Sequence, residues 1–177
     1  MNFDSSSFEI GMGVVHPVHG AGVIKNIEEM RVPGGKIRKY LQVSLFQKGL
    51  TIKIPAEGEL AIRHLANDHH LEECLRVLKS PPTALKQRWN RDHSENLKKI
   101  KSGDLSLVAE VARDLLARHN DDHSRLSILD QKLLSDVCEQ IRGEVECYMG
   151  IRGEKKAKIE SHMQAVCEKI MEIIDFS

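Results

Sequence analysis

The sequence predicts an α+β protein of two domains, an all-β domain over residues 8–62 and an all-α domain over residues 68–175. Glycine and proline are frequent up to about residue 60 and scarce after residue 67. The first region has short runs rich in β-branched residues, whereas apolar residues in the second recur with the period of a helix. A chain of 177 residues with 41% hydrophobic side chains is long enough for two small cores.

Short apolar runs separated by turn residues predict the strands of the first domain. These runs cover residues 14–15, 22–27, 40–45 and 50–54. Several alternate apolar with polar side chains, as half-buried antiparallel strands do. Pro33, Gly34 and Gly35 predict a hairpin loop, because glycine adopts positive φ without strain. Four or five short strands predict a small, strongly bent barrel of the SH3 or Tudor kind.

Five amphipathic helices forming a compact bundle are predicted for the second domain, each with an apolar stripe at helical spacing. Pro81 and Pro82 end the first helix, and the second begins between Thr83 and Trp89 and runs to Lys101. The other stripes include Leu105, Val108, Ala112 and Leu115, then Leu134, Val137, Cys138 and Ile141, and finally Ile159, Met163, Val166, Ile170 and Ile174.

The fourth helix has a recognisable start and an interrupted end. Ser127 and Asp130 have the S-x-x-D spacing of a weak capping box, which predicts a helix that starts at Ser127. Gly150 and Gly153 interrupt the apolar pattern of this helix. We therefore expect the helix to be broken near these glycines.

Composition argues against several protein classes. The chain has no run of eighteen apolar residues, and residues 1–7 lack the basic and apolar regions of a secretory signal, so neither a membrane span nor an exported precursor is expected. Its 26 basic and 26 acidic residues give no net charge that would attract it to nucleic acid or lipid. The four cysteines are far apart and lack C-x-x-C spacing, which predicts reduced thiols in a cytoplasmic protein.

Nine histidines raise the alternative of a small metal-dependent hydrolase. His16 and His19 have H-x-x-H spacing, but an extended segment does not bring residues three apart onto one face, and no third ligand is near in sequence. His69 and His70 precede a predicted helix and are expected to serve its first turn. Because the sequence has no nucleophile elbow or glycine-rich phosphate loop, we predict no catalytic residue, no metal and no cofactor.

The segment around Trp89 is the strongest indication of a binding function. Residues 79–101 contain seven Lys/Arg, two Asp/Glu and the single tryptophan. On a helix, Arg88, Arg91 and Lys98 share one face, whereas Trp89 lies on the apolar arc, so a ring buried in the core is one interpretation. If the first helical turn instead lies at or near Trp89, the ring projects from an exposed helix N-terminus beside phosphate-binding cations, where it can wedge against a base step.

Several blocks of the sequence carry a resemblance to a known family. They are residues 8–11, 14–22, 50–55, 89–91, 96–104, 108–115 and 126–127. In this order they resemble the CarD/CdnL family of bacterial transcription regulators, and the resemblance covers roughly residues 8–142.

The resemblance implies a Tudor-like RNA-polymerase-interacting domain followed by a helical DNA-binding domain. In such proteins the first domain adds its sheet edge to a lobe of the polymerase β subunit. The residues implied in this contact are Lys53, Arg31, Thr51 and Ile52. The expected protein is a cytoplasmic monomer that associates with the nucleoid through the polymerase.

The resemblance also implies a role in promoter melting. The helical domain would lie at the upstream edge of the transcription bubble, where Trp89 wedges into the minor groove and stabilises the open complex. Lys86, Arg88, Arg91 and Lys98 would hold the DNA phosphates, and tethering to the polymerase would allow these contacts to be weak and salt-sensitive. The alternative is a polymerase- or protein-interaction module without DNA contact, in which the tryptophan is structural.

Overall fold

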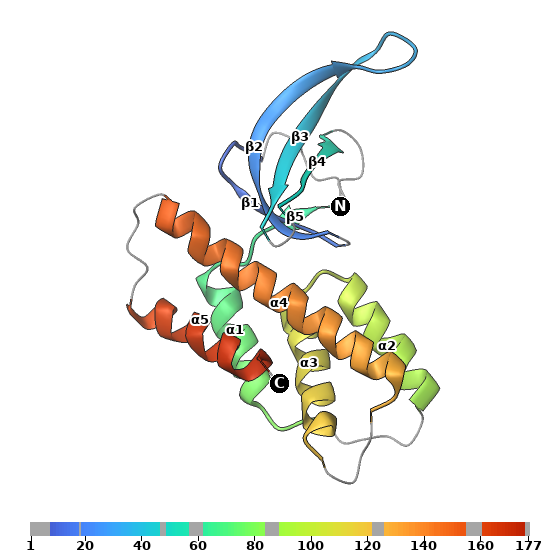
Figure 1. The fold of residues 1–177 in the computed structure, drawn as a ribbon, viewed down its shortest axis with the longest axis vertical. Helices are drawn as coiled ribbons and strands as arrows, with labels where there is room; N and C mark the ends of the chain where they lie inside the picture. The colour runs from blue at the N-terminus through green and yellow to red at the C-terminus, as the bar shows by residue number, and fades with distance from the viewer. Residues whose placement is uncertain are drawn as a thin grey trace. The chain divides into compact units, whose positions relative to one another are not determined.

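The computed structural model describes residues 8–17, 19–46, 49–56, 62–83, 89–121, 126–154 and 161–175, without the side chains of residues 89–92 and 153–154. The chain divides into two compact units (Figure 1). The β unit comprises Met1–Leu65 and Glu146–Lys158, and the helical unit comprises Ala66–Val145 and Ile159–Ser177. Neither unit is a single continuous stretch of sequence, whereas two continuous domains were predicted.

The β unit contains an antiparallel five-stranded sheet with strand order β4-β3-β2-β1-β5. Its strands are β1 (Gly13–His16), β2 (Gly20–Arg31), β3 (Ile37–Leu45), β4 (Thr51–Pro55) and β5 (Arg63–His64). The long β2–β3 hairpin closes through Gly34 and Gly35, whose φ angles are +96° and +79°. The predicted hairpin loop is therefore confirmed.

The sheet is open, so the predicted closed barrel is not confirmed. β4 and β5 are its two edges, and within the described residues no pairing joins them. The reason lies in strand length: β5 has only two residues, Arg63 and His64, and both pair with β1. Curvature enters the sheet instead through a register shift between Ile24 and Asn26 in β2.

Both faces of β1 and β2 are covered by apolar side chains. Val14 and Ile24 belong to the main core of the β unit, and neither is accessible to solvent. Val15 points to the opposite face, as successive strand residues do, and joins a second cluster with Val23 and Cys147. This second cluster depends on a helical segment that lies far along the chain.

The predicted five helices are confirmed. They are α1 (Asp68–Lys79), α2 (Trp89–Lys101), α3 (Leu105–His119), α4 (Ile128–Glu154) and α5 (Ser161–Ile174). The predicted apolar stripes of α1, α3, α4 and α5 are largely buried, whereas Leu97 in α2 is 36% exposed. Ile159 lies outside the described residues. The buried residues include Leu71, Cys74, Leu78, Leu105, Val108, Ala112, Leu115, Leu134, Val137, Cys138, Ile141, Met163, Val166, Ile170 and Ile174.

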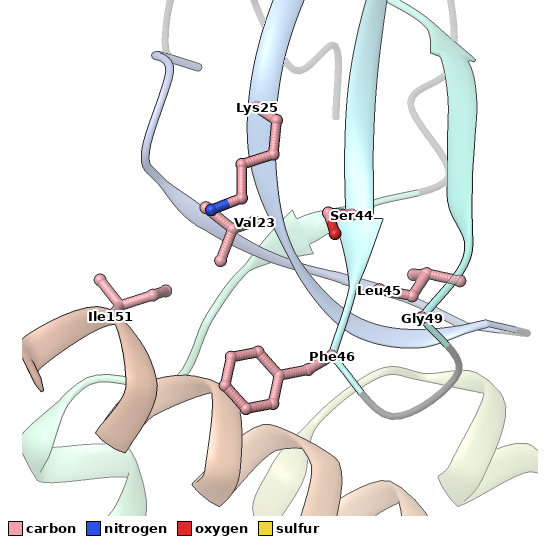
Figure 2. Close-up of a pocket in the computed structure, with 7 residues that line it drawn as sticks. All are labelled: Val23, Lys25, Ser44, Leu45, Phe46, Gly49 and Ile151. Atoms are coloured by element: carbon pink, nitrogen blue, oxygen red, sulfur yellow. The ribbon is translucent and has the colours of Figure 1, made fainter. Parts of the chain in front are cut away.

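The predicted interruption of the fourth helix at Gly150 is wrong, because α4 continues to Glu154. Gly150 has a packing role instead: a Cβ atom there would overlap the ring of Phe46. Figure 2 shows the Phe46 side chain directed from the end of β3 toward the helix. A helix position without a side chain therefore allows an aromatic ring of the β unit to approach the backbone of α4 closely.

Candidate functional site

Within the described residues, the outer edge of β4 has backbone groups that no neighbouring strand pairs. The Leu45 N–H donates to Leu50 O, and the Ala56 N–H donates to Lys39 O, both at 2.8 Å. Because antiparallel pairing alternates, the even-numbered residues of β4 face β3, and the backbone groups of odd-numbered residues point away. The outward residues are Thr51, Lys53 and Pro55. Within the described part of the chain, this strand is the edge of its sheet.

The side chains of β4 are divided between two faces. Thr51 and Lys53 are exposed, whereas Ile52 packs against the main core of the β unit. Lys53 Nζ lies 2.6 Å from Glu28 Oε1 and 3.8 Å from Met30 Sδ, so its charge is already paired on the surface.

Arg31 does not lie on the same face as Lys53. Lys53 contacts Met30, and the adjacent Arg31 at the end of β2 points to the opposite face, because strand side chains alternate. The predicted polymerase-binding residues are thus close in the sheet but do not form one patch of cations.

The described part of α2 begins with the backbone of Trp89, and residues 84–88 before it lie outside the described residues, so an N-terminal wedge stays a prediction. Lys86 and Arg88 lie outside the described residues, and for Trp89 and Arg91 only the backbone is described. Lys98 is exposed, and no described carboxylate pairs with it. Positions 91 and 98 are seven residues apart and therefore share one face of α2.

α2 is connected to its neighbours by polar contacts that the sequence did not predict. The Asp130 side chain is 3% exposed, and its oxygens lie 3.9 Å from His93 Nδ1 and 3.6 Å from Arg118 Nη2. A buried carboxylate needs such a cationic partner. The sequence marked Asp130 only through its spacing to Ser127, whose Oγ accepts the Asp130 N–H at 3.1 Å.

The histidines do not assemble a metal site in the described residues, where no group of three or more His, Cys, Asp or Glu side chains has suitable geometry. His16 and His19 have their ring centroids 4.6 Å apart. His70 completes a capping box: the Asn67 side chain accepts the His70 N–H at 3.0 Å, and His70 Nδ1 accepts the Asn67 N–H at 3.4 Å. The predicted role at the first turn is confirmed for His70.

All four cysteines are buried and free, with no disulfide among them. Burial raises the pKa of Cys74 to about 12, and the Glu144 carboxylate adds to this effect. Burial also raises the pKa of Cys138 to about 12. Because the thiolate is the reactive form, these two thiols are poor nucleophiles at neutral pH.

The β unit has a pocket of about 280 Å³ between the β2–β3 sheet and α4 (Figure 2). It is lined by Val23, Lys25, Ser44, Leu45, Phe46, Gly49 and Ile151. Among the described residues of this lining, Lys25 is the only ionisable side chain, so they contain no acid–base pair for catalysis. It gives no support to the hydrolase alternative.

The β unit has an antiparallel sheet with an open edge, and the helical unit contains the basic helix α2. These two features are typical of a binding protein with two separate contact surfaces. Two family models match successive parts of the chain: the CarD-like/TRCF RID domain matches residues 8–66, and the CarD C-terminal domain matches residues 73–161. The second match extends beyond residue 142, where the resemblance in the sequence becomes weak.

A curated relative covers most of the chain. It is the Bacillus subtilis (strain 168) protein described as "Putative transcription factor YdeB", which is 29% identical over 153 residues. The aligned region is 85% of this chain and 97% of that protein.

The chain therefore belongs to the CarD/CdnL family, as the resemblance implied. This family consists of transcription-associated proteins that interact with RNA polymerase, and it points to a non-catalytic role. Among the described helices, none has the length and apolar character needed to cross a membrane.

Proposed function

We propose that this protein binds RNA polymerase through the outer edge of β4 and stabilises the open promoter complex with the segment that leads into α2. The observation that carries the proposal is the outer edge of β4, where the odd-numbered residues direct their backbone groups away from β3. The first N–H groups of a helix have no partner within the helix and favour phosphate. We infer that Trp89 lies in such a first turn, where its ring would be suited to contact an opened base step.

The polymerase contact is proposed as β-augmentation by the β subunit. The outward backbone groups of Thr51 and Lys53 supply donors and acceptors for an added strand. The Lys53 side chain is 46% exposed, and its ammonium group pairs with Glu28. In the complex, an acidic side chain of the polymerase would replace Glu28 as the partner of this ammonium group. Arg31, at the end of β2, would extend the contact along the hairpin, and Ile52 would support the strand from the core side.

The DNA contact is proposed as a minor-groove wedge at the upstream fork of the bubble. Trp89 would stack against an unpaired step, and Lys86, Arg88, Arg91 and Lys98 would contact phosphates. Direct binding to free DNA is expected to be weak, because Asp92 lies within the same helix and the overall charge is balanced. Tethering to the polymerase raises the effective concentration and compensates for weak contacts.

A Trp89→Ala variant tests the wedge. The expected result is a shorter open-complex lifetime with an unchanged free energy of unfolding, measured by competitor-challenged transcription and by urea denaturation. A loss of about 3–5 kcal/mol in stability would identify the ring as part of the core. A stable variant with a normal open-complex lifetime would favour the alternative, a polymerase-interaction module without DNA contact.

A Lys53→Glu variant tests the edge separately. It should reverse the charge beside β4 and abolish pull-down by the polymerase β lobe. Lys25→Glu is the matched control, because Lys25 lies on the interior strand β2 and its substitution makes the same change in net charge. Equal retention of the complex by both variants would exclude this edge.

A further inference from the structure

The pocket of the β unit has apolar walls. Val23 of β2 is 5% exposed, and Phe46, which follows β3, is 43% exposed. Ile151 of α4 packs against the same cluster as Val23, and all three residues belong to the β unit. Figure 2 shows their side chains around one space of about 280 Å³. Because a water molecule occupies only about 30 Å³ in the liquid, this space has room for a small organic molecule.

A β-bulge brings Lys25 to this pocket. The pairing of β2 with β3 passes directly from Ile24 to Asn26, so Lys25 is the extra residue of the bulge. A bulge redirects side chains, which is why bulges are frequent beside binding sites. Lys25 is exposed, and it lines the pocket together with Val23 (Figure 2). The irregularity in β2 thus places one ammonium group beside the apolar walls.

Ser44 adds a second polar group to the lining. It lies opposite Val23 in the register of β2 and β3, and it is half-buried. Opposite residues of paired strands share one face of a sheet, so the Ser44 hydroxyl lies on the same face as Val23. Among the lining residues that the structure describes, there is no carboxylate to repel an anion. An ammonium group and a hydroxyl group beside apolar walls match a ligand with an apolar body and one anionic end.

We propose that this pocket binds a small apolar carboxylic acid, aromatic or aliphatic, as its anion. The carboxylate pairs with the Lys25 ammonium group and accepts a hydrogen bond from the Ser44 hydroxyl. The apolar body packs against Val23, Phe46 and Ile151. A sugar needs more polar partners than these walls supply, and a cation is repelled by the lysine. The site uses none of the residues proposed to bind polymerase or DNA.

Isothermal titration calorimetry of the full chain with cinnamate and with neutral cinnamyl alcohol tests the charge recognition. We expect saturable binding of one cinnamate per chain. The alcohol has nearly the same shape but no charge, so it should bind roughly twofold to tenfold more weakly, as expected for an ion pair at an exposed lysine. Octanoate and octanol repeat the comparison with an aliphatic body.

Three variants assign the binding to this pocket. Lys25→Gln should weaken binding of the acids roughly twofold to tenfold and leave binding of the alcohols unchanged. Lys39→Gln is the matched control, because Lys39 is an exposed lysine of β3 outside the described lining and its substitution makes the same change in charge. Phe46→Ala should weaken cinnamate and cinnamyl alcohol alike, by about twofold to tenfold, because both lose the same aromatic wall. Thermal denaturation is measured first, and Phe46→Leu carries this part of the test if Phe46→Ala does not fold.

The outcomes decide the proposal in both directions. Saturable binding that Lys25→Gln weakens for the acids alone, and that the Phe46 variant weakens for acid and alcohol, would support it. Equal affinities for acid and alcohol, equal affinities of the wild type and Lys25→Gln for the acids, or no saturable binding of either acid would refute it. The assays of polymerase binding and open-complex lifetime contain no such acid, so their results bear on the proposed function alone.

Discussion

A proline substitution at Thr51 should separate the binding function of β4 from its structural function. Thr51 is the first residue of this edge strand, and the pairing register directs its N–H away from β3. Proline is tolerated at such a position, so we expect the free energy of unfolding to change by less than about 1 kcal/mol. The side chain of Lys53 remains in place, so only a backbone donor and the threonine side chain are lost.

The expected cost appears in complex formation. When a polymerase strand adds to β4 of Thr51→Pro, one carbonyl of that strand lacks the N–H of residue 51 as its donor, which costs about 1–3 kcal/mol of binding free energy. This corresponds to an affinity for RNA polymerase core that is about fivefold to 150-fold weaker, measured by biolayer interferometry.

Ile52→Pro is the matched comparison for Thr51→Pro. Ile52 pairs with Val43 in the hydrogen-bonded register, and its side chain packs against the core. Its substitution should therefore cost about 2–4 kcal/mol of stability. The edge model is wrong if Thr51→Pro binds polymerase as tightly as the wild type, or if it unfolds as readily as Ile52→Pro.

Three further predictions concern stability and reactivity. Gly22→Ala should destabilise the protein by about 1–3 kcal/mol in urea denaturation, because its Cβ would lie 2.6 Å from a backbone oxygen of β3 that cannot move aside; a neutral effect would contradict this packing. Burial, and secondly the charge of His19, lowers the pKa of His16 below 6.5 in the folded protein. As the pH falls, His16 is therefore protonated in the unfolded chain before it is protonated in the folded protein. The free energy of unfolding should decline as the pH falls below about 6.5 and should level off once His16 is also protonated in the folded state. A His16→Asn variant whose stability depends on pH as steeply as that of the wild type would show that His16 does not cause this decline. Cys74 and Cys138 should resist alkylation at pH 8 in the native protein and react after unfolding, and rapid native labelling detected by mass spectrometry would disagree with their raised pKa values.

The helical stripes could be predicted because their signal is local. Val108, Ala112 and Leu115 recur at spacings of three and four, and all three are buried in α3. The path of α4 through Gly150 could not be predicted in this way. Glycine weakens a helix when its neighbours are considered alone, but Phe46, more than one hundred positions earlier, packs where a side chain at position 150 would lie.

The candidate site could be predicted only in part, because it also depends on contacts between residues that are distant in sequence. The run of residues 50–54 predicted a strand, but its position at the sheet edge follows from the pairing of all the strands. The contacts of Asp130 with His93 and Arg118 require three helices to meet, and no spacing in the sequence reveals them.

The division of α4 between the two units has a consequence for biosynthesis. The Cys147 thiol donates to the Gly22 carbonyl oxygen at 3.6 Å across 125 positions, and Ile151 packs against the same cluster. The strands are synthesised before Cys147 and Ile151, so this face of the sheet remains exposed to water until that part of α4 has been translated. A nascent fragment that ends at residue 65 therefore contains all five strands but leaves the apolar face formed by Val15, Ala21 and Val23 without its helical cover.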